Sequence, residues 1–178
     1  FKNLVDKIEF VDIYREISLI NDIRSIIQVY KVIKKYDPDL IYVHSSKAGA
    51  VGRLANIVIG KPIIYNPHGW AFNMNLSNMK RKVYIFIERL LSKFTDKIIV
   101  ISNKENIVAK ENNICRKNNK IEVIINGIDV EKYSNIKFDY SKFRKKLEIP
   151  EAVKVIGMVG RITFGKGPDV FVKVAEKI

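Results

Sequence analysis

Apolar runs and amphipathic segments alternate along most of the chain. Runs that are largely apolar predict buried strands, and they occupy residues 7–13, 40–44, 62–68, 97–102 and 120–127. Segments in which apolar residues recur every three or four positions predict helices, at residues 22–36, 48–59, 82–94 and 103–112. Strands that alternate with helices in this way favour a parallel sheet covered on both faces. The pattern therefore predicts an α/β fold with a doubly wound parallel sheet.

The predicted helices have recognisable ends and faces. Asn21 or Asp22 can cap the first helix, and Pro38 stops it because the residue before a proline is pushed away from helical angles. The predicted core-facing side of the helix at 82–94 consists of Val83, Phe86, Ile87, Leu90, Leu91 and Phe94. Glu88 lies within this apolar helix and needs a partner if it is buried. Nothing in the pattern assigns Arg53 more than a surface position.

The pattern changes after Gly127. Residues 131–152 are polar and predict a connection that carries a short helix at 141–147. A new strand and then a new helix are predicted in residues 153–178. We therefore expect a first domain at residues 1–130 and the start of a second domain after the connection. Both ends of the chain look cut, so we expect a piece of a longer protein.

The chain is strongly basic, with 32 Lys and Arg against 19 Asp and Glu in 178 residues and a formal net charge of +13. A basic surface can meet nucleic acid, an anionic membrane or a phosphorylated ligand. The lysines are spread along the chain, which leaves a compositional bias as the alternative. One cysteine, Cys115, and two histidines argue against an internal disulfide and a structural zinc site. No apolar run approaches the roughly 18 residues of a membrane span.

Polar residues follow four successive predicted strands. Ligands bind at the carboxyl ends of the strands in open parallel sheets, so these positions predict a binding site. They are His44-Ser45-Ser46-Lys47, Pro67-His68-Gly69-Trp70, Ser102 and Asn126-Gly127. Both histidines of the chain belong to this set, which favours a functional site over ordinary turns. Ser45 or Ser46 can instead cap the helix that follows.

Residues 160–166, GRITFGK, match the first part of a phosphate-binding P-loop. Gly167 stands where the magnesium ligand, a serine or threonine, belongs, and Pro168 interrupts the helix. A nucleoside triphosphatase is therefore not favoured. Arg161 and Lys166 can still direct their charges at a phosphate, beside the positive end of a helix that begins near Pro168.

Several motifs occur together, in order and at consistent spacing. They are HSSKAGAVGRLA, PHGWAF, IER, IIVIS, VIINGID and GRITFGKGPDVF. In this combination the chain resembles family 4 glycosyltransferases, in the branch that builds bacterial capsule, exopolysaccharide or lipopolysaccharide. The resemblance implies a GT-B fold of two Rossmann-like domains and a retaining, metal-independent sugar transfer. It also implies that most of the acceptor-side domain is present without its first strand, and that this fragment alone is inactive.

The resemblance assigns roles to the polar residues. Arg161 and Lys166 would hold the phosphates of a nucleotide-sugar donor. His68 would be the catalytic residue, acting by position near the transferred sugar rather than as an established base. The acceptor side of the cleft would be lined by His44, Ser45, Lys47, Gly69 and Asn126. The nucleotide-sugar is a co-substrate, so neither a cofactor nor a metal is expected.

Residues 70–84 combine apolar and basic side chains. Such a mixture suits a membrane interface, and a lipid-linked acceptor would make docking there useful. The predicted membrane-surface residues are Trp70, Phe72, Lys80, Arg81 and Lys82. A loop tucked against the domain is the alternative. With this docking the protein would work peripherally at the cytoplasmic face of the plasma membrane.

The expected function is transfer of a sugar to a glycan or a polyprenyl-diphosphate-linked acceptor in cell-surface polysaccharide synthesis. Two other functions stay open. A basic nucleic-acid-binding α/β module would need lysines and aromatic residues clustered on one surface. Most aromatic residues fall at core-facing positions, so no nucleic-acid partner is expected. The other alternative is a non-catalytic sugar-binding domain.

Overall fold

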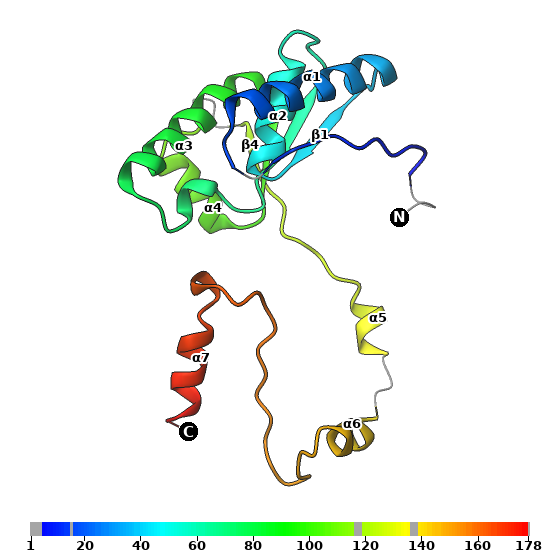
Figure 1. Cartoon of the computed structure of the whole chain (residues 1–178), viewed down its shortest axis with the longest axis vertical. Coiled ribbons are helices and arrows are strands. Elements are labelled where there is room, and N and C mark those ends of the chain that lie inside the picture. Colours follow the sequence, from blue (N-terminus) through cyan, green and yellow to red (C-terminus); the bar gives the residue numbers. More distant parts are fainter. Residues whose placement is uncertain (1–4, 15, 116–118, 136–138, 178) are drawn as a thin grey trace. The chain divides into compact units, whose positions relative to one another are not determined.

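The computed structural model describes residues 5–14, 16–115, 119–135 and 139–177 (Figure 1). The chain divides into two compact units, and the division falls between Asn126 and Gly127. The elements of the first unit are, in order, α1 (Leu19–Tyr36), β1 (Ile41–His44), α2 (Ser46–Asn56), β2 (Ile63–Asn66), η1 (Ala71–Asn73), α3 (Asn78–Leu91), η2 (Ser92–Phe94), β3 (Lys97–Val100), α4 (Asn103–Glu111) and β4 (Ile121–Val123).

Four parallel strands form the sheet of the first unit, in the order β1-β2-β3-β4. Their register aligns Val43, Tyr65 and Ile98 across the first three strands, and Val100 pairs with Val123 at the far edge. Each pair of neighbouring strands is connected through a helix, α2, α3 or α4. The predicted α/β class and the parallel sheet are therefore confirmed.

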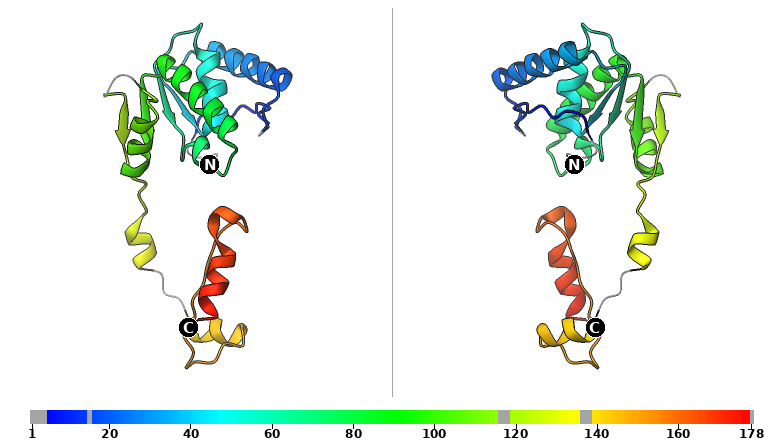
Figure 2. Two further views of the ribbon diagram at one scale, coloured as in Figure 1. Left: turned by 90° about the vertical axis from the view of Figure 1, so that its left-hand side faces the viewer. Right: turned by 90° about the vertical axis from the view of Figure 1, so that its right-hand side faces the viewer.

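The connecting helices pack against one face of this sheet. Tyr65, Ile98 and Val100 form the buried core there with Ala109 of α4, and Ile85 of α3 packs against the same cluster. Right-handed crossovers that all step in one direction leave their helices on one side of the sheet. The helix α1 lies beside α2, as the views of Figure 2 show.

The residues that alternate with the core-facing ones point to the other face of the sheet. Tyr42 and His44 of β1 lie exposed there. On the same face Lys97 and Glu122 form an exposed ion pair with 2.7 Å between the ammonium nitrogen and the carboxylate oxygen. The described part of the chain thus places its polar strand residues, including one histidine, on the face away from α2, α3 and α4.

The strand predicted at residues 7–13 is not formed. This segment lies along α1, where the backbone N–H of Asp12 donates to Oε1 of Gln28 at 2.9 Å and its carbonyl accepts from the Ser25 hydroxyl. Phe10 is 94% exposed. The prediction was wrong because no strand among the described residues pairs with this segment, and a parallel strand needs a neighbour.

Two glycines let α2 approach the sheet closely. A Cβ atom at Gly49 would lie 2.3 Å from Cε2 of Tyr65, and one at Gly52 would lie 2.6 Å from Cγ1 of Val43. The Tyr65 ring is fully buried and its hydroxyl is hydrogen-bonded, so it cannot move aside cheaply. The sequence segment AGAVGR therefore sets the distance between helix and sheet.

Replacing Gly49 with alanine is expected to destabilise the first unit by about 1–3 kcal/mol, because the added methyl overpacks a rigid aromatic ring. The gain of roughly 1 kcal/mol from alanine in a helix offsets only part of this cost. Urea unfolding measures the change. The control is Gly127→Ala, whose Cβ would meet no atom within 4 Å. Equal unfolding midpoints for the two variants would contradict the close packing.

The second unit contains α5 (Val130–Ser134), α6 (Tyr140–Lys146), η3 (Phe164–Lys166) and α7 (Pro168–Ala175). The short helix predicted at 141–147 and the last predicted helix are confirmed. The strand predicted at the start of residues 153–178 is not formed within the described residues. Its apolar side chains, such as Ile156 and Val159, are exposed and its backbone pairs with no strand there. A parallel strand needs a neighbour, so an apolar run alone does not make one.

Among the described residues, no helix is both long enough and apolar enough to cross a membrane.

Candidate functional site

The two histidines meet at the carboxyl end of the sheet. His44 ends β1, and His68 follows β2 by two residues. Nδ1 of His44 lies 2.9 Å from Nε2 of His68, and the two rings stack with centroids 5.1 Å apart. One ring must donate the proton of this hydrogen bond and the other must accept it, so the pair resists holding two positive charges. The placement of both histidines at strand ends thus brings them into direct contact.

Asn66 organises the backbone beneath this pair. It is 4% exposed, its Oδ1 accepts from the backbone N–H of His68 at 3.0 Å, and its Nδ2 donates to the Tyr42 hydroxyl at 3.3 Å. The Tyr42 ring in turn packs against His44, with centroids 4.1 Å apart. The sequence reasoning missed Asn66 and Tyr42 because each lies inside a strand pattern, where alternation suggested only packing.

Positive backbone angles accompany the site. His68 has φ of +52° and Ser45 has φ of +65°, which non-glycine residues adopt only at a cost, and Gly69 follows with φ of +120°. Strained residues of this kind cluster at ligand sites because the surrounding structure holds them in place for binding. The strain at His68 is held by the Asn66 side chain, which supports a positioned rather than a freely rotating imidazole.

The pKa of His44 is lowered from its ordinary value near 6.5, first by partial burial and then by repulsion from His68. A lowered histidine pKa means that the folded state binds the proton at a lower pH than the unfolded chain does. The free energy of unfolding is therefore highest above a pH of about 6.5, where His44 is neutral in both the folded and the unfolded state. It decreases as the pH falls below that value, because the unfolded chain binds the proton more readily. We expect the His44 ring resonance to titrate below 6.5 in an NMR pH series.

A His68→Gln variant provides the control for this titration. It removes the repulsive charge but keeps the burial, so the pKa of His44 should rise and yet remain below its ordinary value. An unchanged midpoint in the variant would show that the two rings do not interact.

Lys47 is engaged elsewhere. Its Nζ lies 2.6 Å from the carboxylate of Asp22 and 2.9 Å from the carbonyl of Glu16, which ties α2 to the start of α1. Lys47 is thus paired with Asp22, and its assignment to the acceptor side of the cleft stays a prediction. Ser45 is the N-cap residue of α2, but its side chain makes no capping hydrogen bond. Its hydroxyl is therefore not committed to the helix.

Gly69 faces a capping arrangement at the end of β3. Ser102 caps α4 by accepting from the N–H of Glu105 at 3.2 Å, and a Glu105 carboxylate oxygen accepts from the N–H of Ile101 at 3.1 Å. A Cβ at Gly69 would lie 3.6 Å from the other Glu105 oxygen. The sequence signal for Glu105 was present as S-x-x-E, the capping-box pattern.

Trp70 and Phe72 are buried, with 2% and 1% of their surface exposed. They stack on each other within the core cluster, and Nε1 of Trp70 donates to the carbonyl of Glu105 at 3.0 Å. Their assignment to a membrane surface is therefore corrected: the segment after β2 tucks its aromatic residues into the domain. Lys80, Arg81 and Lys82 of that prediction are exposed on α3.

Arg53 and Glu88 form a buried ion pair. Nη2 of Arg53 lies 2.9 Å from Oε2 of Glu88, and their side chains are 0% and 5% exposed. The guanidinium lies 3.8 Å above the Tyr65 ring, and the Tyr65 hydroxyl donates to Oε1 of Glu88 at 2.9 Å. Burial, followed by the Glu88 charge, raises the pKa of Tyr65 well above its usual range. Arg53 is therefore the partner that Glu88 required, and the surface placement of Arg53 was wrong.

The remaining predicted residues lie outside the histidine pair. Asn126 is exposed beyond the end of β4. Arg161 and Lys166 belong to the second unit, where both are exposed and Lys166 closes the short helix η3, just before Gly167 and α7. Their assignment to donor phosphates stays a prediction. Within the described residues, no group of three His, Cys, Asp or Glu side chains is arranged to hold a metal ion.

Curated relatives are similar in sequence to this chain over most of its length. A protein of Escherichia coli described as UDP-Gal:alpha-D-GlcNAc-diphosphoundecaprenol alpha-1,3-galactosyltransferase is 35% identical over 170 residues, which are 92% of this chain and 42% of that protein. CapM of Staphylococcus aureus, a capsular polysaccharide biosynthesis glycosyltransferase, is 30% identical over 161 residues, 86% of this chain and 40% of its own length. The chain thus spans less than half the length of these relatives.

Solved structures share the fold. Anabaena HepE in complex with UDP and glucose matches with a TM-score of 0.71 at 21% identity, over 95% of this chain and 44% of that one. A glycosyltransferase from Rickettsia africae matches with a TM-score of 0.68 at 24% identity, over 96% of this chain and 43% of that one. A family model matches residues 4–132, most of the first unit and beyond. By that match and by its relatives, the chain belongs to Glycosyltransferase Family 4.

Proposed function

We propose that the protein transfers a sugar from a nucleotide-sugar to a glycan or a polyprenyl-diphosphate-linked acceptor during the synthesis of a cell-surface polysaccharide. The observation that carries this proposal is the 35% identity to the Escherichia coli galactosyltransferase across 92% of the chain. The description of that relative names a UDP-sugar donor and a diphosphoundecaprenol acceptor. The polar site at the carboxyl end of the sheet is where an open α/β fold binds ligands.

The proposed roles follow from the chemistry of the residues. The imidazole of His68, held against His44, contacts the sugar near the reaction centre. Arg161 and Lys166 stabilise the negative charge that develops on the leaving nucleoside diphosphate, which is the kind of electrostatic assistance that lowers such barriers most. These two cations replace the metal ion that other glycosyltransferases use at the phosphates, so the proposed transfer is metal-independent. The resemblance to family 4 glycosyltransferases further implies that the transfer retains the anomeric configuration.

A lipid-linked acceptor places the reaction at the inner surface of the plasma membrane, with the protein bound peripherally. A nucleic-acid-binding module is not favoured, because the relatives are polysaccharide glycosyltransferases. Nucleic acid is accordingly absent from the proposed partners, which are the donor, the acceptor and an anionic membrane surface.

The experiment is a donor panel on the complete protein. UDP-galactose, UDP-glucose, UDP-N-acetylglucosamine and guanosine-linked sugars are offered with a synthetic GlcNAc-diphosphoryl lipid, and released nucleoside diphosphate is measured. Release with one donor, dependent on the acceptor and insensitive to EDTA, supports the proposal, and the anomeric configuration of the product by NMR tests retention. Binding of a sugar without any release would favour the non-catalytic sugar-binding domain.

A further inference from the structure

The outward side of α3 carries a row of exposed apolar residues. The helix packs inward through Tyr84, Ile85, Glu88 and Leu91. The exposed row on its other side, continued into η2, consists of Met79, Val83, Phe86, Leu90 and Phe94. These positions are separated by three or four residues, so they form one line along the helix. Met79 is 76% exposed and Phe86 is 65% exposed. The prediction that Val83, Phe86, Leu90 and Phe94 face the core is therefore wrong.

Positive charge accompanies the apolar row throughout. The exposed charged residues of α3 and η2 are Lys80, Arg81, Lys82, Arg89 and Lys93. Lys82, Arg89 and Lys93 are spaced by seven and four residues and so line one flank of the apolar row. The acid of this helix, Glu88, is buried against Arg53 and cannot offset them. The exposed side of the helix therefore offers apolar groups and cations.

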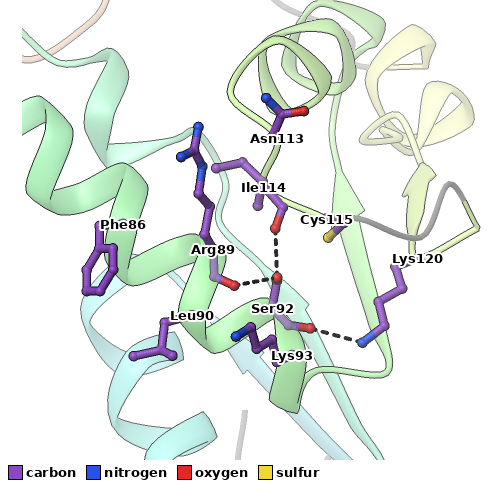
Figure 3. A pocket seen from close by; sticks show the side chains of 9 residues that line it. All are labelled: Phe86, Arg89, Leu90, Ser92, Lys93, Asn113, Ile114, Cys115 and Lys120. Carbon is purple, nitrogen blue, oxygen red and sulfur yellow. Dashed lines mark hydrogen bonds between the residues drawn. The ribbon is translucent and has the colours of Figure 1, made fainter.

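A cavity at the end of α3 continues this surface (Figure 3). It has a volume of about 710 Å³ and lies between the last turn of α3 and the segment that leads to β4. Phe86 and Leu90 form an apolar wall, and Arg89, Lys93 and Lys120 bring three cations to the rim. None of the described residues that line it is acidic. Nζ of Lys120 donates to the carbonyls of Ser92 and Thr95, which holds that ammonium group beside the opening.

We propose that the exposed side of α3, with this cavity, is the surface through which the protein docks on an anionic lipid bilayer. Apolar side chains would enter the boundary between headgroups and acyl chains, and the flanking cations would contact lipid phosphates. Lysine and arginine are suited to this, because their stems lie along apolar surface while their charges reach the polar layer. The cavity accommodates a lipid headgroup against Phe86 and Leu90.

Charge decides between a bilayer and a second copy of the chain as the occupant. A second copy docked through the same surface would place its own Lys82, Arg89 and Lys93 opposite these cations. Like charges placed opposite each other across an interface are unfavourable. An anionic bilayer supplies both the negative charge and the apolar layer that this helix lacks. The inference rests on the proposed function for the lipid-linked acceptor that makes docking useful, and it moves the contact from Trp70 and Phe72 to α3.

The test uses the complete protein and two double variants of this surface. Phe86→Gln with Leu90→Gln removes apolar contact, and Lys82→Gln with Lys93→Gln removes charge. Co-flotation with mixed phosphatidylcholine–phosphatidylglycerol vesicles measures binding. Each basic residue near an anionic surface contributes about 1 kcal/mol, so the charge variant should bind roughly thirtyfold more weakly. Wild-type binding should also fall in high salt and on pure phosphatidylcholine.

Matched control variants lie on α1, which also exposes apolar and basic residues. Ile20→Gln with Ile23→Gln and Lys31→Gln with Lys34→Gln change the same kinds of side chain at exposed positions. They should bind vesicles as the wild type does. Equal binding by the α3 variants and the wild type would overturn the inference, and so would absence of wild-type binding. A wild-type dimer in sedimentation velocity that the α3 variants dissociate, with vesicle binding unchanged, would assign the surface to self-association instead.

Turnover separates this inference from the proposed function. With a short-chain, water-soluble acceptor the α3 variants should transfer sugar at the wild-type rate, whereas with the acceptor embedded in vesicles they should be slower. Vesicle binding through α3 without transfer to any acceptor would count against the proposed function alone. Transfer that is equally fast for all variants on embedded acceptor would count against the docking surface alone.

Discussion

Replacing Arg53 with alanine is expected to destabilise the first unit by about 3–5 kcal/mol, because it leaves the Glu88 carboxylate buried without its cation. The guanidinium also donates through Nε to the carbonyl of Gly49 and lies over the Tyr65 ring, so the variant loses contacts in α2 and β2 at once. Urea unfolding followed by far-UV circular dichroism measures the loss.

Two further variants separate burial from charge. Arg53→Met with Glu88→Gln removes both charges and keeps an acceptor for the Tyr65 hydroxyl, and it should recover most of the lost stability. Lys97→Ala breaks the exposed pair with Glu122, whose side chains are 44% and 54% exposed, and should cost less than about 1 kcal/mol. If Arg53→Ala lowered the free energy of unfolding no more than Lys97→Ala does, the buried pair would not be holding α2 and α3 to the sheet.

Replacing Lys166 with alanine is expected to lower kcat of the complete protein about 10²–10³-fold, if the proposed role at the donor phosphates is correct. The leaving nucleoside diphosphate gains negative charge as the sugar bond breaks, and a cation at a fixed place stabilises that charge more than it stabilises the bound donor. Initial rates of nucleoside diphosphate release at saturating donor measure the effect. Arg161→Ala should be affected in the same way.

Lys173 supplies the matched control for this pair of variants. It is an exposed cation on α7, in the same unit as Lys166. Lys173→Ala should keep the wild-type rate, because general positive charge is not what the leaving group requires. A Lys166→Ala enzyme with near-normal turnover would remove that residue from the catalytic site.

The four strands that pair in the sheet, and the edge at which two of them end in the histidine segments, were predictable because they depend on short-range patterns. Apolar runs such as LIYV and KIIV in an α/β chain usually form buried strands of a parallel sheet. The polar residues that follow them mark the edge of the sheet where ligands bind in such folds. That rule places His44 and His68 at the same edge of the sheet. It does not give the 2.9 Å contact between their rings or the role of Asn66, which depend on the backbone turn after β2.

The choice of buried helix face was not predictable in the same way. The helix α3 has apolar residues on two sides, and periodicity cannot tell which side meets the sheet. Glu88 decides it, because its carboxylate is satisfied only when that side faces Arg53 and Tyr65. The ion pair of Lys47 was missed for a related reason: its partner, Asp22, is 25 residues away in the sequence and comes close only when α1 packs on α2.

Strand order has a consequence for how the first unit assembles during synthesis. Each strand pairs with the strand just before it in the chain, from β1 to β4, and each new helix covers the sheet already present. Among the four described strands, none pairs with a segment made much later, so the distance along the chain between their contacting residues stays short, which favours rapid folding. Chains emerge from the ribosome N-terminus first. We therefore expect these four strands to be added to the sheet one at a time, in the order β1 to β4, as the chain emerges.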